Sequence, residues 1–299
     1  MKIAITGKQG QIVRALIERG ADAGVEVVSL GRPEIDLTKP AALAHAIEAA
    51  EADVIVNAAA YTAVDKAESD PETAMAVNAL GAKAVARAAA TIGRPIVQIS
   101  TDYVFDGRLQ RPYREDDAVG PINVYGRTKL AGEYAVAAAN PRHAIVRTAW
   151  VYSPFGVNFV KTMLRLGESR SEIRVVGDQW GAPTSALDIA DALILMARKL
   201  SEQHDDPALY GTFHMTGSGE TSWAGFAEVI LAEAADRGRH AVTVEPIATS
   251  QYPTPAARPA NSRLDVGKIS RAYGAVLPDW RKSVRSSVAR ILGNEEKDD

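Results

Sequence analysis

The segment Lys2-Ile3-Ala4-Ile5-Thr6-Gly7-Lys8-Gln9-Gly10-Gln11-Ile12 decides the fold, because it joins a short apolar strand to a helix through two glycines. Glycine lets the chain turn tightly and lets the backbone approach a pyrophosphate, while the free N–H groups that begin the helix favour an anion. At the head of a strand–helix–strand unit, such a loop indicates dinucleotide binding. Val13 stands where a third glycine is expected, so a tight turn without a ligand stays open as the alternative.

The same alternation of strand and helix continues through the first half of the chain. The apolar runs suit strands that helices cover on both faces, and the Ala-rich runs between them favour helix. Strands are expected at Lys2–Thr6, Val25–Leu30, Asp53–Ala58, Pro95–Ser100 and Ala144–Val151, and helices at Gln11–Ala23, Pro40–Ala50, Pro71–Ile92 and Val124–Ala139. This order predicts an α/β fold, a Rossmann-type doubly wound parallel sheet with right-handed crossovers.

After Tyr152 the alternation loosens, which indicates a smaller C-terminal substrate-binding lobe. Helices are expected at Asn158–Glu168, Ser185–Leu200 and Ser222–Arg237, short strands at Ile173–Val176, Thr212–Met215 and Val242–Pro246, and a loop at Thr249–Asn261 before two terminal helices. We therefore expect a dinucleotide-binding Rossmann domain over residues 1–152 and the smaller lobe over residues 153–299. The boundary is soft, because segments of the second lobe are expected to return to the main sheet.

The composition excludes several classes of function. The chain has 299 residues, is 46% hydrophobic and carries a net charge of −3, so it has material for a large core and no excess of positive charge for nucleic acid. It contains no cysteine, which excludes disulfides, thiol nucleophiles and thiolate metal sites. No apolar stretch approaches the roughly 20 residues that span a bilayer. We expect a soluble, cytoplasmic protein that binds neither nucleic acid nor membrane.

Chemistry is indicated most strongly by Ser100-Thr101-Asp102 together with Tyr125 and Lys129. Tyr125 and Lys129 are four residues apart, so on a helix they share one face. An ammonium beside a phenol stabilises the phenolate and lowers the tyrosine pKa from about 10, which would make Tyr125 a useful acid or base. Thr101 follows directly after the expected strand Pro95–Ser100 and is placed to hold a carbonyl or hydroxyl oxygen beside the phenol.

Long runs of this sequence resemble the extended short-chain dehydrogenases/reductases, and among them the dTDP-4-dehydrorhamnose reductases. The resemblance is collinear over nearly the whole chain. The residues that carry it lie at 57–68, 100–107, 123–133, 147–152, 158–163, 178–184 and 258–264. It implies an oxidoreductase that uses NADPH or NADH to reduce the C4 keto group of dTDP-4-dehydro-L-rhamnose to dTDP-L-rhamnose, the last step of dTDP-rhamnose biosynthesis, which feeds polysaccharide assembly.

The resemblance also implies roles for individual residues. Tyr125 would protonate the developing C4 alkoxide, Lys129 would hold the nicotinamide ribose and depress the tyrosine pKa, and Thr101 would position the substrate. The remaining cofactor contacts would be Gly7, Gly10, Gln11 and Ile12 near the pyrophosphate, Arg32, Asp36 and Leu37 near the adenosine, and Ala59, Ala60 and Tyr61 near the nicotinamide half. The nucleotide sugar would meet Thr62, Val64, Thr101, Asp102, Trp150 as a stacking or capping residue, and Arg258 and Arg263 at its pyrophosphate.

Cofactor preference and metal binding depend on departures from common patterns. After the second expected strand the chain has Arg32 and no carboxylate to repel a 2′-phosphate, which predicts that NADPH serves at least as well as NADH. Some reductases that it resembles dimerise around Mg²⁺ held by glutamates, but the matching positions here are Ala15 and Leu187, which offer no oxygen ligand. We expect no Mg²⁺ site, and either a monomer or a homodimer.

Three other functions share features with this sequence. A sugar-nucleotide dehydratase would carry a glutamate after Asp102, where this chain has Tyr103, so dehydration is disfavoured. Another sugar-nucleotide reductase or an epimerase of the same superfamily uses the same Tyr and Lys and stays open. A non-catalytic regulatory subunit that binds nucleotide also stays open, although the complete set of Thr101, Tyr125 and Lys129 favours an enzyme.

Overall fold

A six-stranded, wholly parallel sheet forms the centre of the computed structural model, which describes residues 1–33 and 35–298. The strand order is β10-β5-β4-β3-β1-β2, with β1 at Lys2–Thr6, β2 at Glu26–Leu30, β3 at Val54–Asn57, β4 at Ile96–Thr101, β5 at His143–Thr148 and β10 at Gly211–His214. The order reverses beside β1, so the α/β fold with a doubly wound sheet is confirmed, and ligands are expected at the carboxyl ends of these strands.

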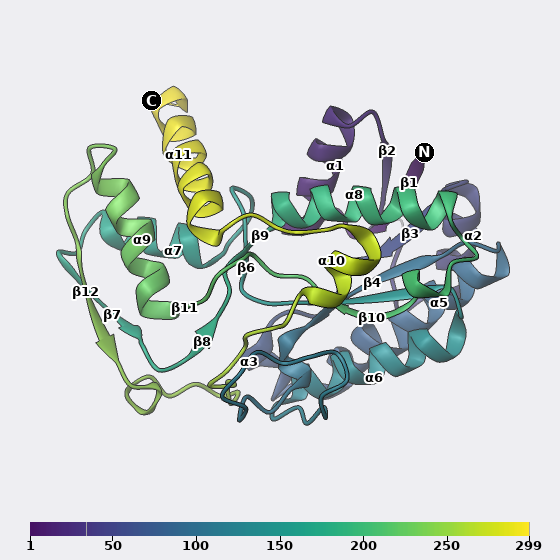
Figure 1. Ribbon diagram of the computed structural model, residues 1–299, viewed down its shortest axis with the longest axis horizontal. Coiled ribbons are helices and arrows are strands. Elements are labelled where there is room, and N and C mark those ends of the chain that lie inside the picture. Colours follow the sequence, from purple (N-terminus) through teal and green to yellow (C-terminus); the bar gives the residue numbers. More distant parts are fainter. Residues whose placement is uncertain (34, 299) are drawn as a thin grey trace.

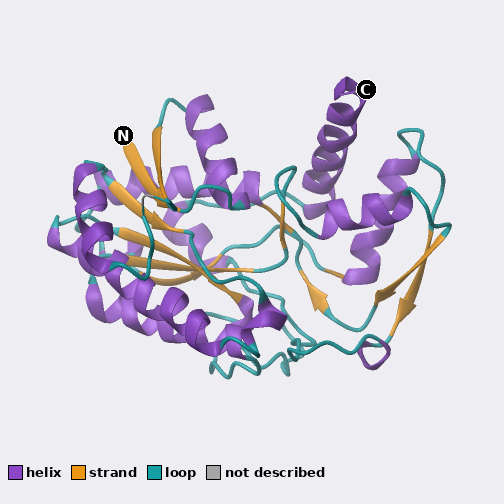
Figure 2. Cartoon of the chain, turned by 180° about the vertical axis from the view of Figure 1, so that it is seen from behind, coloured by secondary structure: helices purple, strands orange, loops and turns teal. Residues whose placement is uncertain are grey.

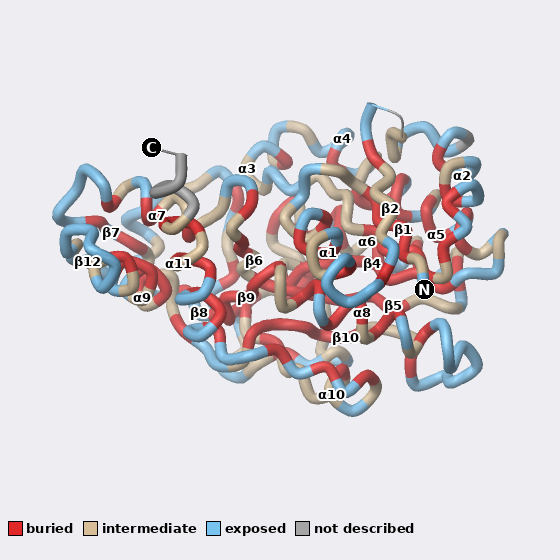
Figure 3. Tube along the Cα trace, turned by 90° about the horizontal axis from the view of Figure 1, so that it is seen from above, coloured by how far each residue is buried: buried red, intermediate tan, exposed pale blue. Residues whose placement is uncertain are grey.

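Helices cover both faces of the sheet (Figure 1). One face carries α1 (Gln11–Asp22), α8 (Ala186–Glu202) and α10 (Gly267–Tyr273); the other carries α2 (Pro40–Ala49), α5 (Ala82–Thr91) and α6 (Val124–Ala139). Alternate residues of β1 divide between the two cores, with Ile3 and Ile5 packed towards α1 and α8, and Ala4 towards α2 and α5. The buried segments therefore run along the central strands, as Figure 3 shows.

The remaining elements form a second group beside the sheet (Figure 2). It contains α7 (Phe159–Gly167), α9 (Trp223–Ala235), α11 (Trp280–Asp298) and the parallel pair β7 (Glu172–Val176) and β12 (Thr243–Ile247). These elements share a second apolar core around Tyr152, Phe226 and Trp280. Although α8, β10 and α10 follow residue 152, they pack on the main sheet, and the division at residue 152 remains a proposal.

Short elements connect the two groups. The pair β6 (Val151–Tyr152) and β9 (Thr184–Ser185) is parallel, whereas β8 (Trp180–Gly181) and β11 (Thr221–Ser222) are antiparallel. The other short elements are the helices α3 (Val64–Ala67) and α4 (Pro71–Met75), a π-helical turn at Ala76–Gly81, and 3₁₀ turns at Asp102–Val104, Pro207–Leu209 and Thr249–Gln251.

Two predicted elements are interrupted in the structure, whereas the bounds of most others agree to within one or two residues. The expected strand Ala144–Val151 is broken, because β5 ends at Thr148, Trp150 has φ of 50° and β6 begins at Val151. The expected helix Pro71–Ile92 changes to π-helical geometry at Ala76–Gly81, between α4 and α5. Within the described residues, no helix is long and apolar enough to cross a membrane.

Candidate active site

A cavity of about 540 Å³ lies at the carboxyl ends of β1, β3 and β4. We call it the sheet-edge cavity. It brings together residues that the sequence analysis selected from five separate segments. These are Gly10, Gln11 and Ile12 of the glycine loop, Ala60, Thr62 and Val64 after β3, Thr101 and Asp102 after β4, Tyr125 and Lys129 of α6, and Trp150 after β5.

The glycine loop has the geometry that close approach to a phosphate requires. Gly7 has φ of 102°, a conformation that side chains rarely adopt, and a Cβ there would lie 3.3 Å from the Val13 side chain. Gly10 precedes α1 in extended conformation, and α1 has neither a side-chain cap at its N-terminus nor an acidic residue in its first turn. The positive end of this helix therefore meets the cavity without a competing carboxylate from its own first turn.

The side chain of Gln11 links this loop to the segment after β6. Its Oε1 accepts hydrogen bonds from Ser153 Oγ at 2.8 Å and from Asn158 Nδ2 at 3.0 Å, and its Nε2 donates to Val151 O at 3.4 Å. Gly156 and Val157 of the same segment also line the cavity. Gln11 thus contributes to the cavity wall, while its amide group holds two distant segments together.

Helix α6 presents Tyr125 and Lys129 to the end of β4. It begins after Asn123, whose Oδ1 accepts from Gly126 N at 2.7 Å. At Gly126 a Cβ would lie 2.2 Å from Tyr103 O, so only glycine permits the helix to approach the turn after β4 this closely. The Nζ of Lys129 donates to Ile99 O at 2.7 Å and the side chain is buried.

The pKa of Tyr125 differs from the expectation. Burial and then the Asp102 carboxylate raise it, while the hydrogen bond with Thr101 lowers it. The predicted lowering by Lys129 is wrong for this structure, because burial counts most and the ammonium is directed to the Ile99 carbonyl. Near neutral pH Tyr125 is a protonated phenol, the form that donates a proton.

Two neighbouring groups also have shifted pKa values. Burial lowers the pKa of Lys129 to about 8, against the opposing effect of the Glu133 carboxylate. Burial raises the pKa of Asp102 to about 6, against hydrogen bonds with Ser262 and Thr101; the Thr101 hydroxyl donates to Asp102 Oδ1 at 3.0 Å. Groups with perturbed pKa values in one cavity are the usual sign of a catalytic site.

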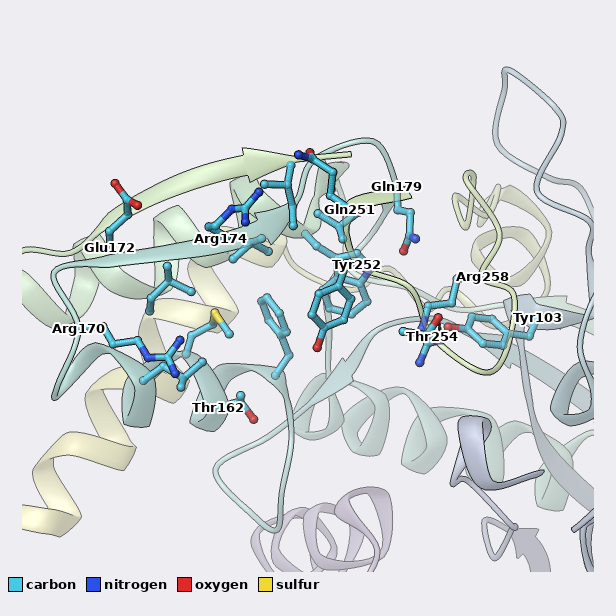
Figure 4. A pocket seen from close by; sticks show the side chains of 18 residues that line it. Tyr103, Thr162, Arg170, Glu172, Arg174, Gln179, Gln251, Tyr252, Thr254 and Arg258 are labelled. Carbon is cyan, nitrogen blue, oxygen red and sulfur yellow. Dashed lines mark hydrogen bonds between the residues drawn. The ribbon is translucent and has the colours of Figure 1, made fainter. Parts of the chain in front are cut away.

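A second cavity has a volume of about 710 Å³, and Figure 4 shows the side chains that line it. We call it the lobe cavity. Its walls come from α7, β7, the end of β12 and the loop that follows, with apolar side chains such as Phe159 and Met163 and the polar side chains of Arg170, Arg174 and Tyr252. Tyr103 and Trp223 line both cavities, so the two meet at these residues.

Arg258 lies in the lobe cavity but already has partners. It makes two hydrogen bonds to the Asp65 carboxylate, at 3.0 and 2.8 Å, and others to Thr254 Oγ1 and Ala256 O. This bidentate pair joins α3 to the loop after β12. The guanidinium is thus held near Tyr103 and Thr254, which line the same cavity and are labelled close to Arg258 in Figure 4.

Seven of the predicted residues stand outside the walls of both cavities. Arg263 donates to Asn261 Oδ1, Gln110 O and the Glu220 carboxylate. Asp36 accepts from Thr38 N and Oγ1, and Leu37 packs against the turn that contains Gly81. The other four are Gly7 and Ala59 in the loops beneath the sheet-edge cavity, the exposed Arg32, and Tyr61, whose hydroxyl donates to Asp70.

Sequence reasoning missed several residues of the site. Trp223, Phe159 and Tyr252 line the lobe cavity, and Glu133 lies one helical turn after Lys129, where it accepts from Ser100 and Arg147. The spacing of Lys129 and Glu133 on one helix face was a usable signal for the last of these. The aromatic residues had none, because they come from segments that only tertiary packing brings together.

Comparison with known proteins gives consistent matches. Residues 1–292 match the family described as the RmlD substrate binding domain. A protein of Sinorhizobium fredii named dTDP-4-dehydrorhamnose reductase is 51% identical over 98% of both chains. Among solved structures, a dTDP-4-dehydrorhamnose reductase of Clostridium acetobutylicum superposes with a TM-score of 0.89 at 40% identity, covering 98% of this chain and 100% of that one. A Bacillus anthracis enzyme of the same name, in complex with NADP, gives 0.87 at 36% identity over 97% and 99%.

Proposed function

This chain belongs to the family described as the RmlD substrate binding domain, and we propose that it is an NADPH-dependent oxidoreductase that converts dTDP-4-dehydro-L-rhamnose to dTDP-L-rhamnose. The observation that carries this proposal is a single cavity in which the glycine loop faces Thr101, Tyr125 and Lys129. A nucleotide held on the loop would bring its reactive end beside the Tyr125 phenol, an acid that burial keeps protonated above neutral pH.

The residues of the glycine loop fit a dinucleotide. The uncapped start of α1 suits the pyrophosphate, the small side chains of Ala58 and Ala60 leave space for a flat ring, and Lys129 is a cation for ribose hydroxyls. When bound, the reduced nicotinamide supplies the hydride that adds to C4 of the sugar.

The chain's own residues then complete the reaction. As the C4 carbonyl accepts the hydride, its C–O π electrons move to oxygen, and Tyr125 donates its phenolic proton to that oxygen. The Thr101 hydroxyl would turn its hydrogen from Asp102 Oδ1 to the phenolate that remains, since a hydrogen bond from Thr101 lowers the pKa of Tyr125. Lys129, whose pKa is about 8, is mainly charged at neutral pH, and because its ammonium donates to Ile99 O, its charge would serve the nicotinamide ribose and not the phenolate.

The lobe cavity would accept the nucleotide part of the substrate. Its volume of about 710 Å³ falls in the range of small-molecule sites, and it combines apolar walls with Arg170 and Arg174 for an anionic ligand. It meets the sheet-edge cavity at Tyr103 and Trp223, so one extended ligand would reach both. Arg258 lines the lobe cavity together with Tyr103 and would face the pyrophosphate, with Asp65 holding its guanidinium.

One experiment separates this proposal from its rivals. Purified protein is mixed with NADPH and dTDP-4-dehydro-L-rhamnose, and the absorbance of the reduced nicotinamide is followed. We expect it to fall in proportion to the product formed. An epimerase would change the sugar without net consumption of NADPH, and a regulatory subunit would do neither. We further propose that the protein is cytoplasmic and that it is a monomer or a homodimer. Light scattering in solution would decide between the two oligomeric states.

A further inference from the structure

Trp150 has an unusual backbone conformation for a bulky residue. Its φ of 50° lies in the left-handed region, and it interrupts the chain between β5 and β6. Such conformations persist where surrounding contacts over-determine them, and they concentrate at functional sites. The contacts that hold Trp150 in this conformation come from Trp223 and Gly181.

Both faces of the Trp150 indole are covered. On one face the Trp223 ring stacks with a centroid separation of 3.7 Å and an interplanar angle of 15°. At Gly181 a Cβ would lie 2.5, 2.8 and 3.0 Å from three fused ring atoms, Cε2, Cζ2 and Cδ2 of Trp150. Nearly equal distances to three bonded atoms place Gly181 above the ring and not beyond its edge. Because the Trp223 stack occupies one face, Gly181 covers the other.

We call the arrangement of Trp150 between Trp223 and Gly181 the sandwich, and the pairing of two short strands builds it. β8 and β11 are antiparallel, with Gly181 opposite Thr221, and Trp223 follows β11 as the first residue of α9. The Ser222 hydroxyl caps that helix by accepting a hydrogen bond from Gly225 N at 3.1 Å, which fixes the start of α9 at Trp223. Phe159 supports Trp223 with a ring separation of 4.7 Å. The segments around 150, 181 and 223 therefore meet at one indole.

The sandwich decides how Trp150 meets the sheet-edge cavity. With both ring faces occupied, only an edge of the indole is left to face the space beside Tyr125. We propose that Trp223 and Gly181 are positioning residues that hold Trp150 edge-on, so that the sugar is oriented with its C4 oxygen towards Tyr125. This inference rests on the proposed function for the identity of the sugar, but the sandwich itself is tested independently of activity.

Circular dichroism tests the stack directly. Two indoles at 3.7 Å couple electronically and give a paired positive and negative band, and the chain has four tryptophans from which it can arise. We expect the paired band in the wild-type protein and in Trp180→Phe, which changes an exposed tryptophan next to Gly181. It should disappear in Trp150→Phe and in Trp223→Phe. A paired band that survives Trp223→Phe would overturn the arrangement.

Kinetics test the positioning role. Trp223→Leu should lower kcat for the keto-sugar by roughly 10- to 100-fold, because small displacements of a positioned group are costly, while the KM for NADPH stays unchanged. Trp223→Phe keeps an aromatic ring against Trp150 and should retain several times more activity than Trp223→Leu. Gly181→Ala forces a methyl group onto the indole and should lower kcat as Trp223→Leu does.

The outcomes separate the two proposals. If Trp223→Leu loses the paired band but keeps kcat within about twofold of wild type, the stack has no positioning role. If the kcat of Trp223→Phe is no higher than that of Trp223→Leu, an aromatic ring at position 223 does not support catalysis, and the inference fails as well. If the wild-type chain shows the band and no turnover of the keto-sugar, the proposed function fails and the stack stands as a structural feature.

Discussion

Replacing Glu133 by glutamine tests the charge network behind the active site. Glu133 Oε1 accepts from Ser100 Oγ at 2.5 Å and from Arg147 Nε at 3.0 Å, and its Oε2 accepts from Arg147 Nη2 at 2.7 Å. The side chains of Glu133 and Arg147 are 3% and 5% exposed, so water screens neither charge. Arg147 also lies over the Phe105 ring at 5.0 Å. Glutamine keeps the shape but leaves the Arg147 charge buried without its partner.

The size of the expected loss of stability follows from the burial of the Glu133–Arg147 pair. Removing one partner of a buried ion pair costs about 3–5 kcal/mol, because the remaining charge stays desolvated. For a chain of this size, that loss lowers the midpoint of thermal unfolding by on the order of 10 °C. The free energy of unfolding from urea titration is the direct measurement. The matched control is Glu26→Gln, which breaks a 3.1 Å pair with Lys2 in which Glu26 is 64% exposed, and which should cost less than about 1 kcal/mol.

The same substitution predicts a change in pH dependence. Burial lowers the pKa of Lys129 to about 8 and the Glu133 carboxylate opposes that shift, so removing the carboxylate lowers the pKa further. Lys129 then loses its proton at a lower pH, and the alkaline limb of the kcat/KM profile should move in that direction. If Glu133→Gln unfolds at the wild-type urea concentration and its alkaline limb does not move, the role we assign to the buried pair is refuted.

Four further predictions concern the cofactor, the acid and the metal. Tyr125→Phe should lower kcat by roughly 10²–10⁴-fold with little change in KM, the usual result of removing a positioned proton donor; wild-type turnover would exclude Tyr125 as the acid. NADPH should serve at least as well as NADH, and Arg32→Ala should reduce that ratio of kcat/KM values, since the exposed Arg32 would meet a 2′-phosphate; an unchanged ratio removes Arg32 from recognition. Asp102→Asn should abolish an ionisation near pH 6 from the kcat/KM profile. Folding raises the Asp102 pKa from 3.8 to about 6, so the ionisation of this carboxyl lowers the stability of the folded protein as pH rises through that interval. Asp102→Asn should abolish that loss of stability as well. If the pH profiles of kcat/KM and of stability were identical to wild type, Asp102 would not be the group that ionises near pH 6. EDTA should leave activity and mass in solution unchanged, because Ala15 is buried against α8 and neither it nor Leu187 has a ligand atom; activity restored by Mg²⁺ after chelation would show the opposite.

The first half of the fold was predictable because its signals are local. Strand Lys2–Thr6 and helix Val124–Ala139 were predicted with the bounds that the structure has, since each is bounded by a glycine turn or an Asn cap adjacent in the chain. The break at Trp150 was not predictable in this way. Propensity favours strand across Ala144–Val151, and what overrides it is contact with Gly181 and Trp223, which are 31 and 73 residues away.

The sequence indicated which chemical groups form the site more reliably than their protonation. The spacing of Tyr125 and Lys129 brought both into one cavity with Thr101, because helix geometry makes four-residue spacing a contact. The pKa of Tyr125 depends instead on the depth of burial, on the Asp102 charge and on whether Lys129 faces the phenol or the Ile99 carbonyl. These quantities depend on the tertiary structure, and here they raise the pKa of Tyr125, whereas the spacing of Tyr125 and Lys129 alone predicts that it is lowered. A phenol that burial keeps protonated near neutral pH is in the form that donates a proton, which is the form that reduction of a carbonyl requires.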